Sequence, residues 1–145
     1  MYREILIPTD GSELATKALR HGVILAKTVG ARVTFLTVYE PYRILTINPA
    51  MIEYTPEEYT KYARQEAEKI LAEGAHRAQE AGVPCETVQM EHEHIYQAII
   101  DYATAHRCDL ITMASHGRRG ISTLVLGSVT LKVLTHCRIP VLVDR

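Results

Sequence analysis

A glycine-rich stretch at residues 113–130 holds the side chains and backbone groups of this sequence best suited to bind an anion. It contains Gly117 and Gly127, and Ser128 follows the second glycine directly. Glycine lets backbone N–H groups approach an anion without interference from a Cβ atom, and a helix N-terminus favours negative charge. Arg118, next to Gly117, adds a guanidinium group of the kind that pairs with phosphate oxygens. The stretch therefore predicts a phosphate-binding loop in which Ser128 is both helix N-cap and phosphate ligand.

Two well-known phosphate-binding patterns do not describe this stretch. No Gly-Lys-Ser/Thr triplet follows the glycines, as it would in a P-loop, and the glycine spacing differs from that of the dinucleotide-binding fingerprint. An alternative interpretation is that both glycines serve only turns and that the neighbouring arginines face solvent. The loop by itself leaves both interpretations open.

The segments that must position this loop alternate between strand-like and helical patterns. Short apolar runs, rich in β-branched residues, predict strands at residues 3–8, 31–39, 85–90, 110–113 and 140–143. Apolar residues at helical spacing predict helices at residues 13–29, 56–81 and 95–107, and a last helix that ends near residue 137. This alternation indicates one α/β domain over residues 1–145, with an open parallel sheet between helices on both faces.

The carboxyl ends of these strands are where a ligand is expected, because open parallel sheets bind ligands at the point where the strand order reverses. That rule selects residues at the carboxyl ends of three of the strands: Pro8, Thr9, Asp10, Val38 and Met113. If the first and fourth strands are neighbours, Asp10 faces the glycine-rich loop. A carboxylate beside a phosphate site contacts a sugar hydroxyl or a metal ion, because like charges repel. The alternative for Asp10 is an ordinary turn aspartate.

Three further polar features have less specific interpretations. Residues 40–54 have no clear periodicity and predict a long loop, which in compact domains is typical of a lid or a binding element. Residues 91–94, Glu-His-Glu-His, contain zinc-binding residue types but have no third ligand at a useful spacing, which favours a solvated loop. His116 lies within the glycine-rich loop, where a hydrogen-bonding or backbone-shaping role is favoured over general base catalysis.

The amino-acid composition limits the cellular location and the kinds of binding partner to be expected. The 145 residues are 47% hydrophobic and 23% charged, and the formal net charge is -1. So small a net charge gives no general attraction to nucleic acid or to an anionic membrane. No apolar run approaches the ~20 residues of a membrane span, and the N-terminus lacks a signal-peptide pattern. We therefore expect a cytoplasmic protein with no nucleic-acid or membrane partner, whose cysteines Cys85, Cys108 and Cys137 are reduced and buried.

Several motifs, spread over essentially the whole chain, resemble the universal stress protein family. They are Ile-Pro-Thr-Asp-Gly-Ser at residues 7–12, Val38, Cys-Asp-Leu-Ile-Thr-Met at residues 108–113 and Ile-Pro-Val-Leu-Val at residues 139–143. The ATP-binding branch of that family carries a signature of glycine, two residues, glycine, nine residues, glycine, then serine or threonine. Here Gly117, nine residues and Gly127-Ser128 match in register, whereas Ala114 replaces the first glycine. One methyl group is a small obstacle, so we expect binding to be weakened or unchanged.

The resemblance implies a Rossmann-like fold with strand order 3-2-1-4-5 and a site for ATP or AMP. Asp10 and the backbone around Ala114 would hold the ribose, and Val38 would meet the adenine. The phosphates would contact Gly117, Gly127, Ser128, Val129 and Thr130, and Asp10 would be an indirect contact for a Mg ion. Members of the family usually form homodimers, often by pairing the last strand across a two-fold axis, and Pro140 to Val143 is apolar enough for this.

Three functions follow from this resemblance. The favoured one is an adenine-nucleotide-binding regulatory protein of the stress response. The second is a slow Mg-dependent ATP hydrolase, which also needs a positioned water. The third is a nucleotide-free homodimer that binds a protein partner and uses its glycines only structurally. Hydrolysis of ATP over hours separates the first two, and failure to bind any adenine nucleotide favours the third.

Overall fold

The computed structural model describes residues 1–43, 54–117 and 125–145, and within them five strands form one parallel sheet. The strands are β1 (Glu4–Pro8), β2 (Arg32–Tyr39), β3 (Cys85–Glu91), β4 (Leu110–Ala114) and β5 (Val141–Asp144). Their order across the sheet is β3-β2-β1-β4-β5, and every neighbouring pair is parallel. This confirms the predicted single α/β domain with strand order 3-2-1-4-5, in which the order reverses between β1 and β4.

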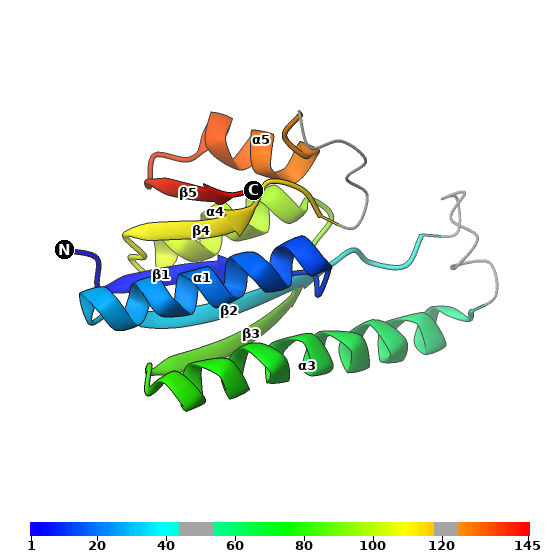
Figure 1. The fold of residues 1–145 in the computed structure, drawn as a ribbon. Helices are drawn as coiled ribbons and strands as arrows, with labels where there is room; N and C mark the ends of the chain where they lie inside the picture. The colour runs from blue at the N-terminus through cyan, green and yellow to red at the C-terminus, as the bar shows by residue number, and fades with distance from the viewer. Residues whose placement is uncertain (44–53, 118–124) are drawn as a thin grey trace.

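Helices cover both faces of the sheet, as the alternating sequence pattern predicts. They are α1 (Glu13–Val29), α3 (Pro56–Ala81), α4 (Ile95–Ala105) and α5 (Ser128–His136). Figure 1 shows α1 and α3 on one face and α4 and α5 on the other. The ends of the first two helices follow from local chemistry, with Ser12 and Thr55 as N-caps and left-handed Gly30 and Gly82 as C-caps. Among the described helices, none has the length and apolar character required to cross a membrane.

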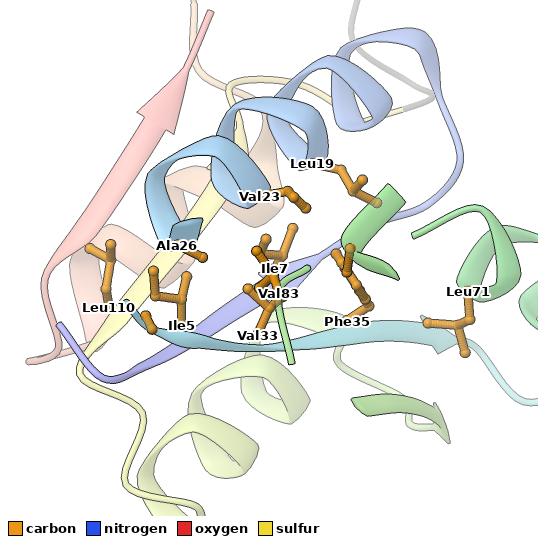
Figure 2. Packing of buried hydrophobic residues seen from close by; sticks show 12 residues of the cluster. Ile5, Ile7, Leu19, Val23, Ala26, Val33, Phe35, Leu71, Val83 and Leu110 are labelled. Atoms are coloured by element: carbon orange, nitrogen blue, oxygen red, sulfur yellow. The ribbon is translucent and has the colours of Figure 1, made fainter. Parts of the chain in front are cut away.

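The side chains of β1 point alternately to the two faces of the sheet, and the hydrophobic core has one layer on each face. Ile5 and Ile7 point toward α1 and α3, whereas Leu6 points toward α4 and α5. In Figure 2 the first layer brings together side chains from α1, α3 and three strands around fully buried Phe35. Because both faces of the central strands are covered by helices, the only part of these strands left for a ligand is their ends.

Several element boundaries differ slightly from those predicted. β1 begins at Glu4 rather than at Arg3. β5 begins at Val141 rather than Pro140, since proline has no N–H group to give to a strand ladder. α4 ends at Ala105, two residues early, because Arg107 has a left-handed backbone with φ of 55°.

The long helix α3 extends past the end of β3 (Figure 1). The apolar pattern at residues 56–81 predicts Tyr62 on the core-facing side of this helix, but its exposed fraction is 48%. It stacks instead on Tyr54, with ring centroids 5.7 Å apart. Tyr62 lies roughly 140–180° around the helix from buried Ala67 and Leu71, so it falls outside the buried stripe of α3. Most of the loop predicted at residues 40–54 falls in residues 44–53, outside the described residues.

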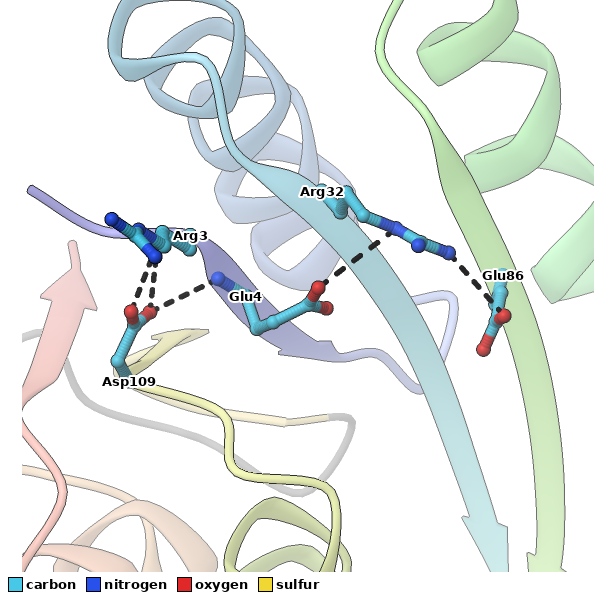
Figure 3. A network of polar contacts seen from close by, with 5 residues as sticks. All are labelled: Arg3, Glu4, Arg32, Glu86 and Asp109. Carbon is cyan, nitrogen blue, oxygen red and sulfur yellow. Dashed lines mark hydrogen bonds and ion pairs between the residues drawn. The ribbon is translucent and has the colours of Figure 1, made fainter.

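A carboxylate joins the starts of β1 and β4 at the amino end of the sheet (Figure 3). Asp109 accepts hydrogen bonds from the N–H groups of Arg3, at 2.9 and 3.2 Å, and Glu4, at 3.1 Å. Beside it, Arg32 lies 3.9 Å from the carboxylate of Glu4 and 3.5 Å from that of Glu86. The Asp109 side chain thus satisfies backbone donors at the edge where β1 enters the sheet.

We expect Asp109→Ala to lower the free energy of unfolding by about 1–2 kcal/mol, because charged hydrogen bonds contribute more than neutral ones and this site is partly solvated. Urea unfolding followed by circular dichroism measures the loss. Asp101→Ala is the matched control, since the Asp101 carboxylate accepts only an exposed bond from Gln97 on the same helix. Equal losses in the two variants would show that Asp109 contributes no more than a surface carboxylate.

Candidate functional site

The loops that leave β1 and β4 lie side by side at the carboxyl end of the sheet, because these strands are neighbours. Asp10 follows β1 and Gly117 follows β4. A Cβ atom added to Gly117 would lie 2.7 Å from Oδ2 of Asp10, so the two residues lie against each other and a larger residue at this position would displace the Asp10 side chain. Asp10 also accepts a 3.0 Å bond from the N–H of Ser12, which fixes its side chain at the start of α1. The prediction that Asp10 faces the glycine-rich loop is confirmed.

Thr9 holds Asp10 in place through its own backbone. Its N–H donates to the carbonyl of Leu36 at 2.9 Å, and its carbonyl accepts from the hydroxyl of buried Thr37 at 2.9 Å. Pro8, the last residue of β1, pairs with Leu36. Sequence reasoning missed Thr37, because a threonine inside a strand gives no sign that its hydroxyl bridges to the neighbouring loop.

Val38 presents backbone groups beyond the end of β1. The Leu36 carbonyl faces β1, and the Tyr39 carbonyl accepts from His92 on the β3 side at 3.0 Å. Since backbone groups alternate along a strand, the N–H and C=O of Val38 face the β1 side, where β1 has already ended at Pro8. Its side chain packs partly buried against the α4–α5 layer. Val38 therefore offers one backbone donor and one acceptor at the carboxyl end of the sheet.

Ala114 replaces a glycine of the family signature without crowding the loop. Its side chain is 7% exposed and packs with Ala15 and Ala18 of α1. Its carbonyl accepts a 2.8 Å bond from the buried hydroxyl of Thr130. Met113, one residue earlier, points into the opposite core layer. The extra methyl group thus lies in the packing between β4 and α1.

Gly127 lies against the backbone of the strand-to-loop turn. Its N–H donates to the carbonyl of Ser115 at 2.7 Å. A Cβ atom here would be 3.1 Å from that carbonyl oxygen and 3.2 Å from Cα of His116. Its φ of -62° is open to every residue type, so it is the close approach to backbone atoms, rather than the backbone conformation, that favours glycine here.

The N-cap of α5 is Gly127, which corrects the predicted capping role of Ser128. The close contact with Ser115 holds Gly127 in an extended conformation, and Ser128 becomes the first helical residue. The helical ladder starts where Leu131 N–H donates to Gly127 C=O at 2.9 Å. The N–H groups of Ser128, Val129 and Thr130 therefore have no acceptor within the helix, and no side chain caps them among the described residues. Such a helix start favours an anion.

Ser115 and His116 connect this loop to the rest of the sheet. The Ser115 N–H donates to the carbonyl of Asp144 in β5 at 2.8 Å, and Ser115 Oγ lies 3.0 Å from His116 Nδ1. His116 is 7% exposed, and Nε2 has no partner in the part of the chain that is described. The predicted hydrogen-bonding role of His116 is confirmed. Arg118 lies outside the described residues.

The remaining candidates do not join this site. In the turn between β3 and α4, the N–H of His94 donates to Nδ1 of His92 at 2.8 Å. Over residues 1–43, 54–117 and 125–145, no group of three histidine, cysteine or acidic residues is arranged to hold a metal ion. All three cysteines are free, as predicted, but only Cys108 is buried, while Cys85 and Cys137 are half-buried.

Comparisons with known proteins agree with this fold. A model of the universal stress protein family matches residues 1–145. Universal stress protein YxiE of Bacillus subtilis is 33% identical, with 100% of both chains covered. The solved structure of protein MJ0577 of Methanocaldococcus jannaschii has a TM-score of 0.82 at 28% identity, over 99% of this chain and 95% of that one. A universal stress protein solved in complex with cAMP has the same fold, with a TM-score of 0.73 at 23% identity, over 99% and 97% of the two chains.

Proposed function

This chain belongs to the universal stress protein family, and on that basis we propose that it is an adenine-nucleotide-binding regulatory protein of the stress response. One observation carries the proposal. The start of α5, which no described side chain caps, and the carboxylate of Asp10 both lie at the carboxyl end of the sheet. They lie where the strand order reverses, between β1 and β4. Helix amides hold phosphate and a nearby carboxylate holds ribose hydroxyls, so this end of the sheet has the complementary groups of a nucleotide.

In this proposal the adenine base meets the backbone of Val38. The Watson–Crick edge of adenine presents an amino donor next to a ring-nitrogen acceptor. The carbonyl and N–H of Val38 are the matching acceptor and donor, and they face the side on which β1 has ended. Pro8 and Thr9 form the adjoining wall, and Asp10 with the backbone of Met113 and Ala114 holds the ribose.

The phosphates would contact Gly117, Gly127 and the free amides of the first turn of α5, with Arg118 adding charge. Asp10 would be the indirect protein contact for a Mg ion, which would supply positive charge to offset that of the phosphates, since magnesium takes oxygen ligands and retains several waters. The Thr130 hydroxyl is already bonded to Ala114, so Thr130 would contribute its N–H group.

We propose that the protein acts in the cytoplasm as a homodimer joined through β5. β5 lies at one edge of the sheet, and Leu142 in its middle is 45% exposed. An edge strand with unpaired backbone groups and an exposed apolar side chain is suited to pair with a second copy. Light scattering during size-exclusion chromatography tests the mass, and Leu142→Asp should shift it toward the monomer.

The nucleotide assignment is tested by mass spectrometry of small molecules released on denaturation, followed by calorimetric titration of ATP, ADP and AMP with and without magnesium. We expect a released adenine nucleotide or saturable binding of an added one. Absence of both would overturn the proposal and favour a nucleotide-free partner-binding module. Release of phosphate over hours in the same samples would instead indicate a slow ATP hydrolase.

Ala114→Gly tests whether the missing signature glycine matters. Because the Ala114 methyl packs against α1, we expect the variant to lose about 1 kcal/mol of stability and to bind nucleotide within about twofold of the parent chain. Thermal unfolding and calorimetric titration measure the two effects. A gain in affinity of tenfold or more would show that the methyl group obstructs the ligand.

A further inference from the structure

A second hollow lies at the amino end of the sheet, opposite the glycine-rich loop. It is formed by the last turns of α4, the turn into β4 and the segment between α5 and β5, and its volume is about 420 Å³. That volume is within the usual range for small-molecule sites. Its apolar walls come from Ile100, Ala103, Cys108 and Ile139. An apolar ligand body would find complementary surface here.

The polar lining of this hollow is cationic. Arg107 and Arg138 both line it, together with His136 and the hydroxyl-bearing Thr104, and no acidic residue does. Within the described residues, neither guanidinium group has an ion-pair partner. Two carboxylates that act electrostatically on Cys108, those of Asp109 and Glu4, have other partners, because Asp109 binds backbone amides and Glu4 lies near Arg32. Two unpaired guanidinium groups beside an apolar wall suit an anionic head group.

The backbone conformation of Arg107 is unusual for its residue type. Cys108 N–H donates to Ala103 C=O at 2.9 Å and Arg107 N–H approaches Thr104 C=O at 3.3 Å, which is the Schellman pattern of helix ends. Its left-handed position normally holds glycine or asparagine, because other side chains are strained there. If a cation were needed only to interact with the helix dipole, a basic residue within the last turn of α4 would be sufficient, but that turn has none. The basic residue is Arg107 instead, and it lines the hollow from a strained backbone position.

Cys108 contributes an apolar wall rather than a nucleophile. Burial raises the pKa of its thiol to about 11, so the thiol stays protonated at neutral pH. Binding in this hollow is therefore noncovalent.

We propose that this hollow is a binding site for a small amphipathic carboxylate, whose apolar chain lies against Ile100 and Ile139 and whose carboxylate pairs with Arg107 and Arg138. The site is independent of the nucleotide proposal, since it lies at the other end of the sheet. Its two requirements, a negative head and an apolar body, can be tested separately.

The test uses the full chain labelled with 15N, titrated with octanoate and, in parallel, with neutral 1-octanol and with acetate. We expect octanoate alone to give saturable shifts of the amides of Arg107, Cys108 and Ile139, with the amide of Gly127 unmoved. Arg138→Gln and Arg107→Asn should each raise the dissociation constant about tenfold, as loss of one charged contact does. Arg20→Gln, an exposed arginine on α1, is the matched control and should change nothing.

The melting temperature is a second measurement, which distinguishes a role of Arg107 in octanoate binding from a role in helix stability. Asparagine tolerates the left-handed backbone better than arginine, so Arg107→Asn should raise Tm by roughly 2 °C while it weakens octanoate binding. Equal binding of 1-octanol and octanoate, an unchanged dissociation constant in both arginine variants, or no saturable shift at all would each overturn the proposal.

Discussion

Gly127→Val should lower the affinity for adenine nucleotide by at least about 100-fold, while the far-ultraviolet circular dichroism spectrum stays near that of the parent chain. A Cβ atom at this position would lie 3.1 Å from the carbonyl oxygen of Ser115 and 3.2 Å from Cα of His116. Both are backbone atoms, so the side chain cannot turn away from them. The start of α5 must move, and with it the three free amides proposed to hold phosphate.

A graded series of variants makes this experiment specific. Gly127→Ala adds the Cβ atom alone and should lose affinity to an intermediate degree, whereas Ala72→Val introduces the same valine side chain on the exposed side of α3 and should bind normally. Calorimetric titration gives the affinities, and thermal unfolding shows that each variant is folded. Parent-like affinity in a folded Gly127→Val protein would contradict the phosphate assignment.

The largest loss of stability is expected for Phe35→Ala, which should lower the free energy of unfolding by about 3–5 kcal/mol. Phe35 is 0% exposed and lies in the core layer under α1 and α3, between Ile7 and Leu71 in Figure 2. Its removal leaves a cavity that rigid neighbours on β1 and α3 cannot fill. Ile24→Ala is the control, because Ile24 is 63% exposed and its truncation should cost less than about 0.5 kcal/mol.

A double variant tests the packing that explains this loss. A Cβ atom added to Gly74 of α3 would lie 3.0 Å from Cγ of Phe35, so Gly74→Ala should destabilise the parent chain. In the Phe35→Ala background the same methyl group enters the cavity and should restore stability. The coupling energy from urea unfolding of the four proteins measures the contact directly. Additive effects would show that α3 does not rest on the Phe35 ring.

Local sequence patterns predicted most of the fold because each pattern reports one element. Cap residues such as Ser12 and Gly30 gave the bounds of α1, and the apolar runs gave all strands to within about two residues. The errors have local causes. Arg107 ends α4 through a left-handed backbone, which residue spacing does not show. Tyr62 lies outside the buried stripe of α3, which the structure identifies by its buried residues.

The residues at the strand ends, namely Asp10, Val38 and the glycines of the loop after β4, can be identified from the order of residues along the chain, because that order gives the groups found at the end of each predicted strand. How these residues meet depends on the fold. Pairing of β1 with β4 brings Asp10 against Gly117, and the contact of Gly127 with Ser115 makes Gly127, not Ser128, the N-cap of α5. These contacts join atoms from separate segments of the chain, so their geometry depends on strand order and packing, which residue spacing does not contain.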